Sequence, residues 1–141
     1  MYLKTRIEEV EEFKVKGYGL KGALSDIPSK WDLLNGEIAK KDVGPEESFG
    51  VCLEMEGDKL HYIAGINSSF AEDFTDTEEV VIPAGKFLVA EVEGGIPAIR
   101  TTFEAIFKMN DIRLRKCYSF QRYIYPEGSS GYEIEVWMPI E

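Results

Sequence analysis

Few side chains in this sequence could carry metal or nucleophilic chemistry. There is one histidine, His61, and there are two cysteines, Cys52 and Cys117, both within runs that alternate like strands. No CxxC or HExxH spacing occurs, and the carboxylates do not follow the spacing of a calcium-binding loop. We therefore expect two buried free thiols, no catalytic residue set, no metal site and no cofactor.

The last part of the chain, FQRYIYP followed by YEIEVWMPIE, combines aromatic and polar residues in a predicted hairpin. If residues 126–131 form its loop, Gln121 faces Val136 on the neighbouring strand, and Arg122 faces Glu135. The second pair joins opposite charges, which favours this register. One surface is then aromatic or apolar except at one amide, and its members are Gln121, Tyr123, Tyr132 and Ile134.

Such a surface is typical of a pocket that binds a small organic molecule. It is also typical of ordinary core, because tyrosine is a good strand former. A slip of one residue would instead bring Glu133, Glu135 and Trp137 to the surface of Gln121. Tyr62 and Trp137 hold similar places in the two predicted hairpins, where they either close opposite ends of a groove or pack in the core.

The elements that would position these residues begin with a strand from Ile7 to Lys16, which Gly17, Gly19 and Gly22 are expected to end. An apolar stripe with helical spacing then predicts a helix over residues 27–41. Its members are Ile27, Trp31, Leu34 and Ile38, and we interpret Trp31 as core.

A hairpin follows the first helix, in SFGVCLEMEGDKLHYIAGI. With Gly57 and Asp58 as its turn, Glu56 faces Lys59 and Leu53 faces Tyr62. His61 would be exposed beside Glu54.

After a polar segment the same order recurs in VVIPAGKFLVAEVEGG, a strand interrupted at residues 83–85. A second helix is predicted to open at Ile96 and Pro97, and the last hairpin closes the chain. The fold is therefore predicted to be α+β, as one domain over residues 1–141 with repeats near 1–70 and 77–141. We expect an antiparallel sheet with both helices on one face and a ligand groove between the halves.

The formal charge of −10 argues against direct nucleic-acid binding, which needs a basic working face. The basic run at Arg113, Arg115 and Lys116 is interpreted as a solvated helix end. No run of residues is apolar and long enough to cross a bilayer, and the amino-terminal residues lack an apolar signal core. We therefore expect a cytoplasmic protein with no membrane partner.

Six segments together resemble the GyrI-like small-molecule-binding domain, which is also the effector-binding domain of AraC-type and MerR-type multidrug-responsive regulators. They are IPSKWDLL, SFGVCLE, LHYIAGI, VIPAGKFLVAEVEGG, FQRY and EIEVWMPI, which span residues 27–140. The resemblance implies a bacterial protein with two strand-helix-strand-strand repeats related by a pseudo-twofold axis. It also implies a small organic ligand.

The family commonly has a glutamate at the position of Gln121, and that acid is associated with lipophilic cations or, in members that are enzymes, with hydrolysis. Glutamine offers a donor and an acceptor without a charge, which favours an uncharged ligand and argues against an enzyme. The predicted function is a stand-alone binding protein, with a separate regulator as its partner. The alternatives are a hydrolase that uses Glu133 or Glu135 in the slipped register, and an acidic inhibitor of another protein.

Overall fold

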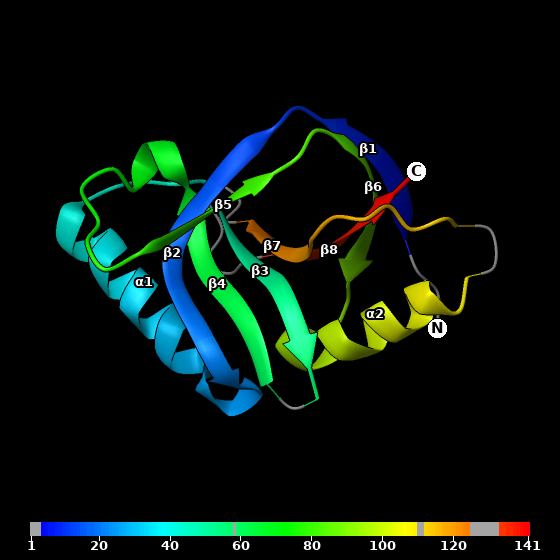
Figure 1. The fold of residues 1–141 in the computed structure, drawn as a ribbon, viewed down its shortest axis with the longest axis horizontal. Coiled ribbons are helices and arrows are strands. Elements are labelled where there is room, and N and C mark those ends of the chain that lie inside the picture. Colours follow the sequence, from blue (N-terminus) through cyan, green and yellow to red (C-terminus); the bar gives the residue numbers. More distant parts are fainter. Residues whose placement is uncertain (1–3, 58, 110–111, 125–132) are drawn as a thin grey trace.

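The computed structural model describes residues 4–57, 59–109, 112–124 and 133–141. Two helices and eight strands are found in these ranges (Figure 1). In chain order the elements are β1 Thr5–Val10, β2 Phe13–Ala23, α1 Ile27–Lys41, β3 Glu47–Glu56, β4 Lys59–Asn67, β5 Glu78–Ile82, β6 Gly85–Val92, α2 Ile99–Phe107, β7 Ser119–Ile124 and β8 Glu133–Ile140. Short 3-10 turns precede both helices, at Leu24–Asp26 and Ile96–Ala98, and a third, Ser68–Phe70, follows β4.

All eight strands form one antiparallel sheet in the order β1-β6-β8-β7-β3-β4-β2-β5. Strands β1 and β2 follow each other as one bent strand, and β5 and β6 form a second one. The two bent strands pair with each other on both sides of their bends, at Val10–Gly85 and at Phe13–Ile82. The sheet therefore curls round on itself, as Figure 1 shows.

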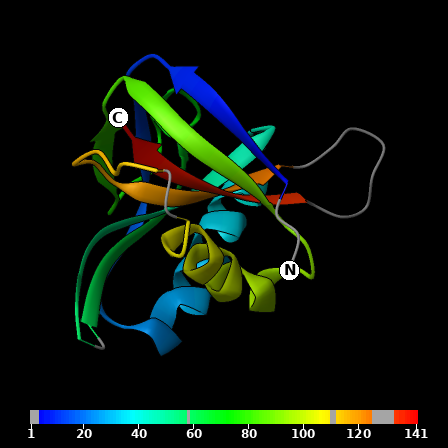
Figure 2. The same cartoon turned by 90° about the vertical axis from the view of Figure 1, so that its right-hand side faces the viewer.

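The curled sheet has an inner face with an aromatic core and an outer face that carries both helices. Helix α1 packs mainly on β2 and β4, and α2 packs on β6 and β8. Both helices lie on the same side of the sheet (Figure 2). This arrangement confirms the predicted α+β class with two helices on one face, and the order strand-helix-strand-strand occurs twice along the chain.

Two of the local predictions agree closely with the structure. The first helix has the predicted bounds, Ile27–Lys41, and it ends at Asp42 in the left-handed conformation. In the last hairpin, Gln121 pairs with Val136, Arg122 with Glu135 and Tyr123 with Ile134, so the preferred register is confirmed and the slipped one is wrong.

The glycines of β2 do not end the strand as predicted. A Cβ at Gly17 would collide with the backbone of Ala64 and Gly65, and one at Gly19 would collide with the Glu78 carboxylate. These glycines permit close approach of neighbouring chain segments, so the strand runs through them to Ala23.

The first hairpin differs from its predicted register by a bulge. Glu56 pairs with Lys59 as expected, but a register shift between Cys52 and Glu54 makes Cys52, and not Leu53, the partner of Tyr62. One extra residue on β3 absorbs this shift, which a turn-based prediction cannot anticipate. His61 pairs with Glu54, but it is only partly exposed, because it bonds the Glu78 carboxylate at 2.8 Å.

None of the helices in the part of the chain that the structure describes is long and apolar enough to cross a membrane.

Candidate functional site

The centre of the helix-bearing face is formed by β3 and β7, which lie between the strands that α1 and α2 cover. One row of paired residues crosses the face here, and its members in order are Ala90, Val136, Gln121, Gly50, Ala64 and Tyr18. The ends of the row pack in the clusters below α2 and α1. Gln121 and Gly50 therefore occupy the middle of the face.

Three aromatic residues and one amide meet at this point. The Trp31 indole Nε1 on α1 donates to the Tyr62 hydroxyl on β4 at 3.1 Å, and that hydroxyl donates to Gln121 Oε1 at 3.3 Å. The Trp31 ring also meets the Tyr123 ring edge-on, with the ring centroids 4.8 Å apart. We call these four residues, Trp31, Tyr62, Gln121 and Tyr123, the strip site.

The burial of the strip site is graded. Tyr62 is 3% exposed and Tyr123 is 9% exposed, while Trp31 and Gln121 are half-buried. Two side chains thus form a covered base, and the indole and the amide are accessible from outside. Among the described residues, Gln121 makes no other side-chain hydrogen bond, so its amide group can still donate to a bound molecule.

The buried base of the strip site carries no charge at neutral pH. Burial, with a smaller contribution from Tyr123, raises the pKa of the Tyr62 phenol far above its ordinary value, so this residue stays neutral. Cys52, the strand partner of Tyr62, also has a raised pKa because of burial. A thiol that remains protonated is a poor nucleophile.

Gly50 lies on the sheet surface directly beneath the Tyr62 hydroxyl and the Gln121 amide oxygen. A Cβ at this position would collide with both groups. The glycine thus gives the two polar groups of the strip site room to meet on the sheet surface.

The predicted site residues are only partly brought together. Gln121, Tyr62 and Tyr123 meet in the strip site, and Ile134 lies beside Tyr123 as its strand partner, 4% exposed. Ile134 also lines a cavity of about 360 Å³ formed with residues 91–95 at the ends of β6 and β8. Tyr132 lies outside the described residues.

Trp137 is separated from the other predicted residues, because it lies on the opposite face of the sheet. It pairs with Phe120, stacks on that ring at 5.4 Å between centroids, and belongs to the inner aromatic core. Side chains alternate between faces along a strand, so the register that brings Gln121 outward turns Trp137 inward.

Sequence reasoning did not assign Trp31, a member of the strip site, or Gly50, which lies beneath it, to a binding site. Trp31 packs against the cluster below α1, in agreement with its interpretation as core, but its indole N–H also bonds the Tyr62 hydroxyl. An indole N–H away from water requires an acceptor, and that requirement was the available signal. Gly50 was not singled out, although a glycine inside a strand often marks a close approach of other groups.

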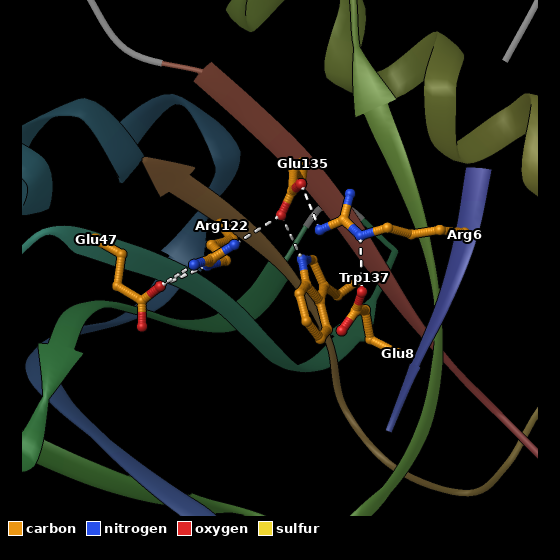
Figure 3. A network of polar contacts seen from close by, with 6 residues as sticks. All are labelled: Arg6, Glu8, Glu47, Arg122, Glu135 and Trp137. Carbon is orange, nitrogen blue, oxygen red and sulfur yellow. Dashed lines mark hydrogen bonds and ion pairs between the residues drawn. The ribbon is translucent and has the colours of Figure 1, made fainter. Parts of the chain in front are cut away.

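The inner face carries a network of ion pairs (Figure 3). Glu135 accepts from Arg122 Nη1 at 3.0 Å, from the Trp137 indole at 3.0 Å and from Arg6 at 2.7 Å. Arg122 also pairs with Glu47, and Arg6 with Glu8. Burial alone would raise the pKa of Glu135, but the hydrogen bonds from Arg6, Trp137 and Arg122 bring it below its ordinary value.

This network borders a second cavity, of about 370 Å³, whose floor includes Phe13, Phe49, Phe120 and Trp137. The arginines that face it are already paired with carboxylates, and Arg122 lies 5.8 Å from the centre of the Trp137 ring. Glu135 is bound by three donors on this face, so it is not available to replace an acid at the position of Gln121. No group of three or more potential metal ligands occurs in the ranges that the structure describes.

Comparison with known proteins identifies a family and a relative. The family described as GyrI-like small molecule binding domain matches residues 3–141. The transcriptional regulator BrlR of Pseudomonas aeruginosa is 31% identical over 113 residues, which are 74% of this chain and 41% of the regulator. The chain thus spans less than half of that relative.

Solved structures share the fold at low sequence identity. The C-terminal domain of EcmrR has a TM-score of 0.75 at 15% identity, with 100% of this chain and 99% of that chain covered. SAV2435 bound to tetraphenylphosphonium has a TM-score of 0.70 at 16% identity, with 98% and 94% covered.

Proposed function

The chain belongs to the GyrI-like small-molecule-binding family, and on that basis we propose that it binds an uncharged aromatic molecule at the strip site. The observation that supports this location is the continuous hydrogen-bond chain from Trp31 through Tyr62 to Gln121, flanked by Tyr123. It places one polar point among aromatic walls, which is the usual composition of a small-molecule site. Ile134 remains a proposed contact at its border, and Tyr132 remains a contact proposed from the sequence.

Three features of the strip site support an uncharged ligand. Gln121 carries no charge, and burial raises the pKa of both the Tyr62 phenol and the Cys52 thiol, so these two groups stay protonated. A buried cation would therefore lack the paired carboxylate that offsets its loss of water. A ligand with an acceptor oxygen or nitrogen would instead receive a hydrogen bond from the Gln121 amide.

We also propose that a separate regulator protein is the partner through which binding acts, since the chain is similar to a transcriptional regulator and its charge of −10 argues against direct contact with nucleic acid. The test is sedimentation of the chain mixed with a full-length regulator of this kind, with and without a bound probe. A complex whose amount changes with the probe supports the partner, and sedimentation as two independent species contradicts it.

The experiment that tests the ligand site uses the two tryptophans as reporters, because the chain has one on each face of the sheet. In ¹⁵N-labelled protein the two indole N–H signals are assigned with a Trp31→Phe variant. The protein is then titrated with triphenylphosphine oxide, tetraphenylphosphonium and tetraphenylborate, which are respectively neutral, cationic and anionic probes of similar shape.

We expect the Trp31 signal to move while the Trp137 signal stays in place, with the neutral oxide bound most tightly. A shift confined to Trp137 would locate binding in the inner-face cavity and contradict the strip site. A preference for tetraphenylphosphonium would contradict the uncharged ligand while leaving the location intact.

A further inference from the structure

Gly50 leaves space that the side chains of two strip-site residues occupy. A Cβ at Gly50 would lie 2.5 Å from Gln121 Oε1 and 2.9 Å from Tyr62 Cζ, and closer still to the Tyr62 hydroxyl. Real Cβ atoms essentially never approach a heavy atom within 3.0 Å. An alanine at this position therefore cannot coexist with the observed placement of both side chains.

The requirement for glycine at this position is not one of backbone conformation. Gly50 is absent from the glycines with positive φ in the described residues, so its backbone is accessible to alanine. It also differs from Gly17, where a Cβ would meet the backbone of a neighbouring strand. At Gly50 the three nearest atoms all belong to Tyr62 and Gln121, which are members of the strip site.

We infer that Gly50 is a positioning residue that sets the specificity of the strip site, an inference that rests on the proposed function. By leaving space on the sheet surface, it lets the Tyr62 hydroxyl lie under the Trp31 indole and bond Gln121. That bond orients the Gln121 amide, whose N–H groups then select a neutral aromatic ligand with an acceptor atom. A larger residue at position 50 would displace the Gln121 amide and leave the aromatic rings of Trp31 and Tyr123 in place.

The first test is spectroscopic and needs no ligand. In Gly50→Ala we expect the Trp31 indole N–H signal to shift, because its acceptor is displaced, while the Trp137 signal stays in place on the far face. The matched control is Gly36→Ala in α1, where an added Cβ meets no atom within 4 Å. An unchanged Trp31 signal in a folded Gly50→Ala protein would overturn the positioning role.

The second test measures selectivity with naphthalene and quinoline, which have the same shape but differ by one acceptor nitrogen. Wild type is expected to bind quinoline roughly tenfold more tightly, which corresponds to one net hydrogen bond. In Gly50→Ala this ratio should fall to near one, mainly through loss of quinoline affinity. A ratio that stays at its wild-type value would show that Gly50 does not set specificity.

If wild type binds neither compound, the proposed function is contradicted, and the indole signal still decides the positioning role by itself. If wild type binds both compounds equally, the amide does not select an acceptor, and the specificity part of the inference is overturned while ligand binding stands.

A double-mutant cycle of unfolding free energies tests the inference if Gly50→Ala folds poorly. The same substitution is made in a Tyr62→Ala background, where the phenol that a Cβ would meet is absent. We expect urea unfolding to show a large loss of stability from Gly50→Ala in wild type and a much smaller loss in the Tyr62→Ala protein. An equal loss in both backgrounds would mean that Gly50 serves the backbone, and the inference would be wrong.

Discussion

Arg122 and Glu135 face each other on β7 and β8, with Arg122 Nη1 3.0 Å from Glu135 Oε1 on the inner face of the sheet. Because side chains alternate along a strand, this ion pair turns the flanking residues Gln121 and Tyr123 to the helix-bearing face. Arg122 also pairs with Glu47 on β3, and Glu135 with Arg6 on β1, so the network joins four strands. The position of the strip site thus depends on charges that lie behind it.

Removal of the Glu135 carboxylate should destabilise the fold. Glu135→Leu leaves Arg6, Arg122 and the Trp137 indole without their shared acceptor, and the Glu135 side chain is only 8% exposed. We expect a loss of about 2–4 kcal/mol in the free energy of unfolding by urea. The control is Glu8→Gln, whose exposed ion pair should contribute no more than about 1 kcal/mol. Equal losses in the two variants would contradict a central role for Glu135.

The contribution of Glu135 should also depend on pH. The pKa of this carboxyl is lower in the folded protein than its ordinary value of 4.5, so the unfolded chain takes up the proton first as pH falls. The stabilisation is therefore fully present above about pH 4.5 and is lost as pH decreases through the lower folded-state pKa. The stability difference between wild type and Glu135→Gln should accordingly shrink between pH 6 and pH 3. A difference that is constant over this range would show that the carboxylate charge is not involved.

Gln121→Glu should reverse the charge preference of the strip site. A carboxylate at this half-buried position would attract a cation and lose the amide donor that recognises a neutral acceptor. We expect affinity for tetraphenylphosphonium to rise about tenfold or more, and affinity for triphenylphosphine oxide to fall. Isothermal titration calorimetry of both probes measures the change, and Gln121→Leu is the matched control without charge. If Gln121→Glu and Gln121→Leu bind the cation alike, the residue does not determine ligand charge.

Tyr62 should resist ionisation at high pH. Its pKa is raised in the folded protein, so it should remain protonated where ordinary tyrosines, with values near 10, have ionised. The absorbance change at 295 nm between pH 8 and pH 11 should therefore be the same in native wild type and in Tyr62→Phe. A smaller change in the variant would mean that Tyr62 titrates normally.

Tyr62→Phe should also lower stability at neutral pH, because the Trp31 indole and the Gln121 oxygen lose the hydroxyl that joins them. We expect a loss of about 1–3 kcal/mol in the free energy of unfolding by urea. The wild-type advantage should decrease as pH rises above 10, since a raised folded-state pKa means that the unfolded chain loses its proton first. An advantage that grows with pH would have the wrong sign.

Local patterns in the sequence were sufficient for several elements. The apolar spacing of residues 27–41 predicted α1 with its observed bounds, because helix periodicity and terminal signals lie within the segment itself. The charge pair of Arg122 and Glu135 specified the last hairpin, because its two residues are close together in the sequence. From that register, the sequence alone determined that Gln121, Tyr123 and Ile134 share a face.

Tertiary structure decided which other residues share that face. The contact of Trp31 with Tyr62 and the pairing of Gln121 with Gly50 both join elements that are distant in sequence. The inward orientation of Trp137, in contrast, follows from the register of the last hairpin. The bulge after Cys52 and the pairing of the two bent strands left no local signal. The physical reason is that such contacts depend on the packing of the whole sheet against both helices. The side-chain periodicity of a strand or a helix, in contrast, describes one element at a time.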